Sequence, residues 1–156
     1  MPTIGEIDIA LAHPVLEAPV EAIARHLQDM VDAEGRQIKN LSVVLTDHGT
    51  VQDLNKKHLG RSYQTDVLAF DLSDPDSSRV VALPIDGEIY IDLDTAFERA
   101  PEFGSTYEKE ILRYAIHGLL HLLGYCDDAA EQRDEMKRLE NYYLNDNPDD
   151  PGGNRC

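Results

Sequence analysis

Three things that the sequence has little of narrow the kind of protein it can encode. Only two of its 156 residues are cysteines, Cys126 and Cys156, so they do not make a framework of disulfide bonds. No apolar run approaches the roughly 18 residues that a membrane-spanning helix needs. The N-terminal segment has no cluster of positive charge, and Glu6 and Asp8 interrupt its apolar stretch, which argues against a signal peptide. We therefore expect a cytoplasmic protein with no membrane partner.

Basic residues are scarce as well. Fourteen Lys and Arg stand against thirty Asp and Glu, which gives a formal net charge of −16. Such a charge repels nucleic acid at long range and lowers the expectation of RNA binding, but it does not exclude a local basic groove. A solvated acidic surface, screened by salt, explains it equally well. The 42% of hydrophobic residues is typical of a globular protein.

The order of apolar patterns predicts a single α+β domain over residues 1–144, followed by a flexible tail over 145–156. Four segments have the pattern of β-strands: 5–13, 41–46, 65–72 and 87–93. Four others have helical periodicity: 19–35, 50–59, 105–123 and a last helix that begins near Asp128.

The sequence also contains residues that are expected to cap or end these helices. Thr50 is expected to cap the second helix, and Ser105 with Glu108 to form a capping box at the start of the third. Gly124 is expected to end the third helix, because glycine readily adopts the positive φ that lets the chain double back.

The stretch HGLLHLLGYCDD, residues 117–128, places two histidines four positions apart in an apolar helix. His117 and His121 therefore project from one face, one turn apart, which is the geometry of a metal-binding pair. After the turn at Gly124, the carboxylate of Asp127 can complete a three-ligand site. Three protein ligands with an open position are typical of catalytic zinc, since water must bind there. We predict one Zn²⁺ per chain, with other divalent transition metals as alternatives.

Other interpretations of this stretch are weaker. Cys126 is a good zinc ligand in principle but falls one residue short in the turn, and Asp128 is more useful as a helix cap. A zinc protease would carry a glutamate as general base where this chain has Gly118. Iron oxygenases also use two histidines and a carboxylate, but generally on barrel strands. Both histidines could instead have ordinary hydrogen-bond partners, an interpretation that suits a lone histidine better than this pair.

The same stretch resembles the motif of the YbeY endoribonuclease family, H-G-x-L-H-L-x-G-Y-D-H. Residues 117–125 match it, whereas Cys126 and Asp127 stand where the family usually has Asp and His. Two upstream segments, LNKKHLGRSYQTDVLAF and DGEIYID, are similar to two further family segments in the same order. The resemblance covers roughly residues 40–143.

This resemblance implies a small mixed β-sheet of about four strands with the histidine helix packed across it. It implies a zinc-dependent endoribonuclease, specific for single-stranded RNA, in small-subunit rRNA 3′-end maturation and ribosome quality control. The implied partners are rRNA and the small ribosomal subunit, and not DNA. Two other functions stay open: a ribosome-assembly or adaptor module with a structural metal, and a metallohydrolase of a non-RNA substrate.

Three residues are candidates for catalysis: Arg61, Asp66 and Glu88. The family's arginine falls on Leu59 here, and Arg61 either replaces it, by neutralising a phosphate, or is a solvated loop residue. Asp66 and Glu88 either bond nearby backbone groups, orient a histidine ligand, or act as the general base.

One basic cluster stands near these motifs, formed by Lys56, Lys57, His58 and Arg61. We expect the phosphate backbone of RNA to bind to this cluster. A solvent-exposed charged face of a helix would account for the cluster nearly as well.

Overall fold

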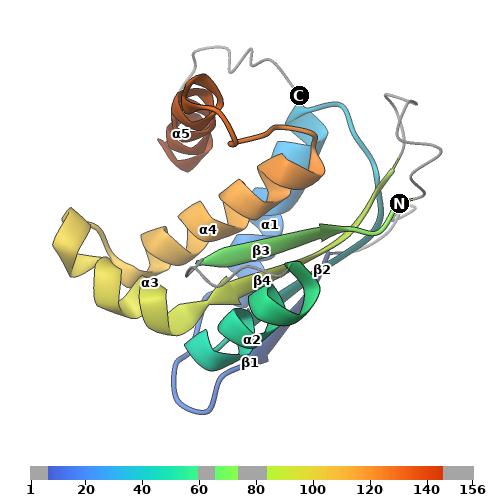
Figure 1. The fold of residues 1–156 in the computed structure, drawn as a ribbon. Helices are drawn as coiled ribbons and strands as arrows, with labels where there is room; N and C mark the ends of the chain where they lie inside the picture. The colour runs from blue at the N-terminus through green and yellow to red at the C-terminus, as the bar shows by residue number, and fades with distance from the viewer. Residues whose placement is uncertain (1–6, 60–65, 74–83, 146–156) are drawn as a thin grey trace.

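A four-stranded sheet with the spatial order β1-β2-β4-β3 organises the fold (Figure 1). The computed structural model describes residues 7–59, 66–73 and 84–145. The strands are β1 (Ile7–Ala12), β2 (Ile38–Thr46), β3 (Val67–Asp71) and β4 (Ile85–Asp92). The first two strands and β4 run parallel, and β3 pairs antiparallel with β4 at one edge. The predicted α+β fold with a small mixed sheet is therefore confirmed.

Helices cover both faces of this sheet. In the described part of the chain they are α1 (Val20–Ala33), α2 (His48–Leu59), α3 (Leu93–Arg99), the 3-10 helix η2 (Pro101–Phe103), α4 (Tyr107–Leu122) and α5 (Ala130–Asn145). None of these helices is both long and apolar enough to cross a lipid bilayer. Residues 146–156 of the predicted tail, and Arg61, lie outside the described residues.

Two predicted helix caps are wrong. The side chain of Asp47, rather than Thr50, accepts the backbone N–H at the start of α2, where the N–H of Thr50 itself is the donor at 2.7 Å. At the start of α4 the extended residue is Thr106, whose hydroxyl accepts the N–H of Lys109 at 3.1 Å. Asp47 and Thr106 have the same capping chemistry as the predicted residues, which lie three positions and one position away, so composition alone does not separate them.

The short helix α3 was not predicted, because it continues directly from β4. Asp92 ends the strand and caps the helix, and its carboxylate accepts the N–H of Thr95 at 2.9 Å. Seven residues are too few for a clear helical period.

Alternation along β4 separates the two faces of the sheet. Ile89 faces α4, where it would meet any side chain at position 118. Tyr90 points to the other face, where its ring contacts Phe70, which in turn contacts His58 of α2. The main core lies between the first face and helices α1 and α4, with Leu27, Ile89 and Ile116 among its fully buried members.

The helix α4 lies unusually close to the sheet at Gly118. A Cβ atom there would stand 2.7 Å from Cγ2 of Ile89 and 3.2 Å from Cγ2 of Val67. Ile89 is fully buried and β-branched, so it cannot rotate away without disturbing the core.

We expect Gly118→Ala to lower the free energy of unfolding by up to about 2 kcal/mol, because an overpacking cost of about 1–3 kcal/mol outweighs a gain in helix propensity of ~1 kcal/mol. Urea unfolding measures this difference. Gly49→Ala is the matched control, since a Cβ at Gly49 in α2 meets only Oδ1 of Asp47 at 3.5 Å. Equal stability of the two variants would show that the close approach carries no constraint.

Candidate metal centre

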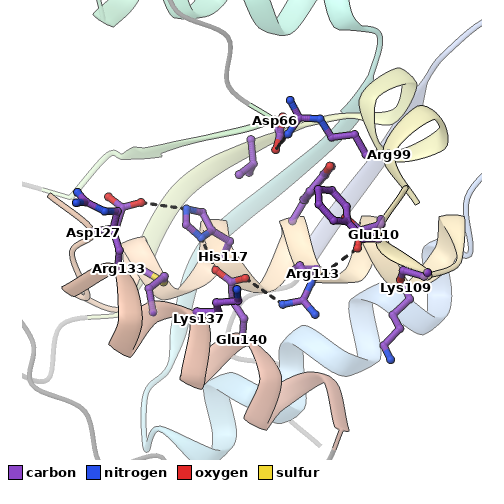
Figure 2. Close-up of a pocket in the computed structure, with 16 residues that line it drawn as sticks. Asp66, Arg99, Lys109, Glu110, Arg113, His117, Asp127, Arg133, Lys137 and Glu140 are labelled. Atoms are coloured by element: carbon purple, nitrogen blue, oxygen red, sulfur yellow. Dashed lines mark hydrogen bonds and ion pairs between the residues drawn. The ribbon is translucent and has the colours of Figure 1, made fainter. Parts of the chain in front are cut away.

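One face of α4 carries polar side chains at helical spacing. They are Glu110, Tyr114, His117 and His121. Spacings of three and four residues place such side chains in one row along a helix. The helix α5 packs beside this row, as Figure 2 shows for His117 and Glu140.

The turn after α4 brings a carboxylate back to the two histidines. Gly124 has a φ of 104°, a left-handed conformation that favours glycine, as expected from the sequence. The N–H of Tyr125 then bonds to the carbonyl of Leu120 at 3.0 Å, which closes the helix end. Asp127 follows three residues after the glycine and points at His117 (Figure 2).

Three candidate ligand atoms meet at this point: Nε2 of His117, Nε2 of His121 and Oδ2 of Asp127. The two nitrogens are 3.1 Å apart, and the oxygen is 3.4 Å from the first and 3.3 Å from the second. Ligands at 2.0–2.1 Å around a tetrahedral zinc ion are separated by about 3.3–3.4 Å. The donor set and its spacing therefore fit one zinc ion.

The carboxylate of Glu140 orients the first histidine from behind. Its Oε2 lies 2.6 Å from Nδ1 of His117, and Glu140 is 9% exposed. Because Nδ1 donates its proton to this carboxylate, the lone pair of Nε2 is directed at the metal position. Arg113 donates in turn to Oε1 of Glu140 at 3.3 Å and to the side chain of Asn141 at 3.1 Å. The arginine therefore fixes the carboxylate that orients the histidine.

The carboxylates also set the charge of the metal-free site. Burial lowers the pKa of His117, but hydrogen bonds to Asp127 and Glu140 outweigh it and raise that pKa to about 9. The hydrogen bond from His117 lowers the pKa of Asp127 to about 2. Burial and the charge of His117 lower the pKa of His121. A metal ion must therefore displace a proton from His117, so metal binding weakens as the pH falls below about 9.

A cavity of about 650 Å³ opens beside this centre (Figure 2). Asp66 lies on its wall with His117 and Asp127, and its carboxylate is 3.5 Å from Nη1 of Arg99. Burial raises the pKa of Asp66, although Arg99 opposes that effect. The hydroxyl of Tyr114 lies in the same region with no hydrogen-bond partner among the described residues, and burial raises its pKa.

The structure brings some of the predicted site residues together and separates others. Asp66 reaches the cavity, whereas Glu88 alternates with Ile89 and so points to the opposite face of the sheet. The described group of close ligand atoms includes neither Cys126 nor Asp128. Lys56 and Lys57 lie on α2, across the sheet from α4.

Glu140 was not found from the sequence. A usable signal existed, because it stands four residues after Met136 and three before Tyr143, both of which are buried. Helical spacing therefore places this carboxylate on the apolar face of α5, where a charged group needs a partner.

Two histidines on a helix packed across a mixed sheet, with a carboxylate from the following turn, define an α+β protein with a candidate single-metal centre. The family model described as Endoribonuclease YbeY matches residues 7–147. The chain belongs to the endoribonuclease YbeY family, as the resemblance of its motifs predicted.

Individual relatives agree with this assignment. An Endoribonuclease YbeY of Salinibacter ruber is 46% identical over 135 residues, which are 85% of this chain and 86% of that protein. Another, of Chloroherpeton thalassium, is 34% identical over 128 residues, 82% of this chain and 86% of that protein. The solution structure of TM1509 from Thermotoga maritima matches with a TM-score of 0.60 and 30% identity, covering 95% of this chain and 99% of that chain.

The third ligand can be tested with adjacent aspartates. We expect Asp127→Ala to weaken zinc binding at least about tenfold, because it removes the carboxylate oxygen, one of the three candidate ligand atoms. Asp128→Ala is the matched control, since Asp128 is exposed and outside that set. Competition with a chromogenic chelator measures both affinities. If Asp128→Ala loses the metal and Asp127→Ala keeps it, the assignment is wrong by one residue.

The orienting carboxylate gives a second test. Glu140→Gln keeps the shape of the side chain but removes its charge, and we expect about 10–100-fold weaker zinc binding. Glu135→Gln makes the same change on the same helix at a residue that pairs with Arg138. Isothermal titration with zinc compares the two variants. Unchanged affinity in Glu140→Gln would leave His117 oriented by something else.

Proposed function

We propose that the protein is a zinc-dependent endoribonuclease that cuts single-stranded RNA in small-subunit rRNA 3′-end maturation and in ribosome quality control. One observation carries the proposal: Nε2 of His117, Nε2 of His121 and Oδ2 of Asp127 stand 3.1–3.4 Å apart beside a cavity. The names of the relatives support the reaction, because both are called endoribonucleases.

The openness of the centre favours a catalytic metal over a structural one. Structural zinc sites are closed by four protein ligands, whereas catalytic sites have three and an open position. The group of described residues supplies three. Their side chains remain 24%, 31% and 34% exposed, in the order His117, His121 and Asp127, so a substrate can reach the ligands.

The surrounding side chains have distinct proposed roles. When bound, zinc supplies Lewis acidity, which favours ionisation of water and offsets negative charge on a phosphoryl oxygen. Asp66 is the proposed general base, since burial raises its pKa and makes it a better proton acceptor. Arg99, beside it on the cavity wall, supplies a positive charge for a phosphate. This is one of the two roles that the sequence left open for Arg61, which lies outside the described residues.

Cleavage of a labelled RNA tests the reaction. Zinc-loaded protein should cut a single-stranded oligonucleotide and spare the same sequence in a duplex. His121→Ala should abolish cleavage, and Asp66→Asn should lower kcat by about 100-fold or more, because a general base contributes that much. Glu88→Gln should retain full activity, since Glu88 points to the opposite face of the sheet.

Other outcomes would replace the proposal. Zinc-loaded protein that cuts no RNA but co-sediments with small ribosomal subunits would be an adaptor with a structural metal. Cleavage of an ester or peptide alone would indicate a different hydrolase. In depleted cells, wild-type protein should restore mature rRNA 3′ ends, and Asp66→Asn should not.

A further inference from the structure

Cationic side chains gather around the cavity beside the metal centre, although the net charge of the chain is −16. Five of the fourteen Lys and Arg line it: Arg99, Lys109, Arg113, Arg133 and Lys137. Four carboxylates line it as well: Asp66, Glu110, Asp127 and Glu140. The cavity is therefore locally positive in an acidic molecule, and a divalent metal would add to that charge. Such a site attracts a polyanion that the rest of the surface repels.

These cations differ in whether they form ion pairs with carboxylates of the protein. Arg113 contacts Glu110 at 3.8 Å and Glu140 at 3.3 Å, so it serves mainly to hold the wall together. Lys109, near the start of α4, and Lys137, on α5, are exposed side chains on the two helices that border the cavity (Figure 2). Their charges are available to a ligand.

An aromatic ring lines the same cavity as these cations. Phe103, at the end of η2, lines the cavity and is 66% exposed. A single exposed aromatic residue is ordinary on a protein surface. An exposed ring that shares a cavity with several cations is instead the combination used for single-stranded nucleic acids, in which cations follow the phosphates and rings stack on the bases.

We propose that a single strand of RNA lies in this cavity, with one base stacked on Phe103 and its phosphates beside Lys109 and Lys137. The inference rests on the proposed function and adds the position of the strand. It also explains why a duplex would be a poor substrate, because paired bases are already stacked and cannot reach the ring. Lys56 and Lys57 lie on α2, across the sheet, so the proposal places the strand away from the cluster predicted from the sequence.

Two double variants, each of which removes two positive charges, test the phosphate contacts. Zinc-loaded full-length protein is mixed rapidly with a fluorescent single-stranded RNA, and binding is measured before cleavage, from low to high salt. Lys109→Ala with Lys137→Ala should weaken binding and reduce the slope of log K against log salt by about 1.4, which is 0.7 per lost contact. Lys56→Ala with Lys57→Ala, which leaves the same net charge, should keep the wild-type slope.

The stacking contact has its own controls. Phe103→Ala should weaken binding of the RNA by about 5-fold to 150-fold, and Phe103→Tyr should retain it. Phe97→Ala, which removes another exposed ring from outside the cavity lining, should have no effect. On an abasic strand of the same length Phe103→Ala should bind like the wild type, because that strand has no base to stack.

Several results would overturn the proposal. They are a slope that changes in the α2 variant and not in the cavity variant, unchanged RNA binding by Phe103→Ala, or an equal loss on the abasic strand. If the zinc-loaded wild type cuts RNA and the cavity variants cut it with an unchanged KM, the proposed position of the strand is wrong and the proposed function stands. If the wild type neither binds nor cuts RNA, both fail, and capture of an acidic protein segment by the same lysines would then identify the occupant.

Discussion

Because Gly118 has no side chain, α4 lies close enough for its backbone to contact Ile89 and Val67 directly. This contact fixes the height and rotation of the helix over the sheet. His117, the residue before it, then contacts α5, and both His117 and His121 contact the turn after Gly124. Imidazoles on a helix fixed in this manner lose little freedom when they bind an ion, so the rigid packing below the helix supports the chemistry above it.

Two charged side chains lie behind His117: Glu140 of α5 and Arg113 of α4. Glu140 is buried, and a buried carboxylate destabilises a protein unless its oxygens are paired. Here one oxygen is near Nδ1 of His117 and the other near Arg113. The same contacts that stabilise the carboxylate determine which nitrogen of His117 is free. Packing of α5 and orientation of the ligand are thus one arrangement.

The three candidate ligands, which are close in sequence, were predictable from spacing. The side chains that reach the site through tertiary packing were not, apart from Asp66, which the family resemblance supplied. His117, His121 and Asp127 lie within one helix end and one turn, so helical spacing placed the histidines and the glycine turn placed Asp127. The position of Glu140 depends on how α5 docks, and that of Phe103 on an unpredicted turn after α3. Glu88 shows a limit of another kind. Side chains alternate between the two faces of a strand, and the match of a residue to a family motif does not tell which face it occupies.

Asp127 lies three residues before α5, and Glu140 lies within it, so the histidines of α4 connect to that helix and to the turn before it at two separate points. A metal ion would bind the conformation in which α5 packs against α4, and not a conformation in which α5 has separated from it. By mass action, the concentration of free metal would then set the local unfolding equilibrium of the C-terminal helix. Metal starvation would accordingly shorten the lifetime of this segment against cellular proteases, independently of any loss of catalysis.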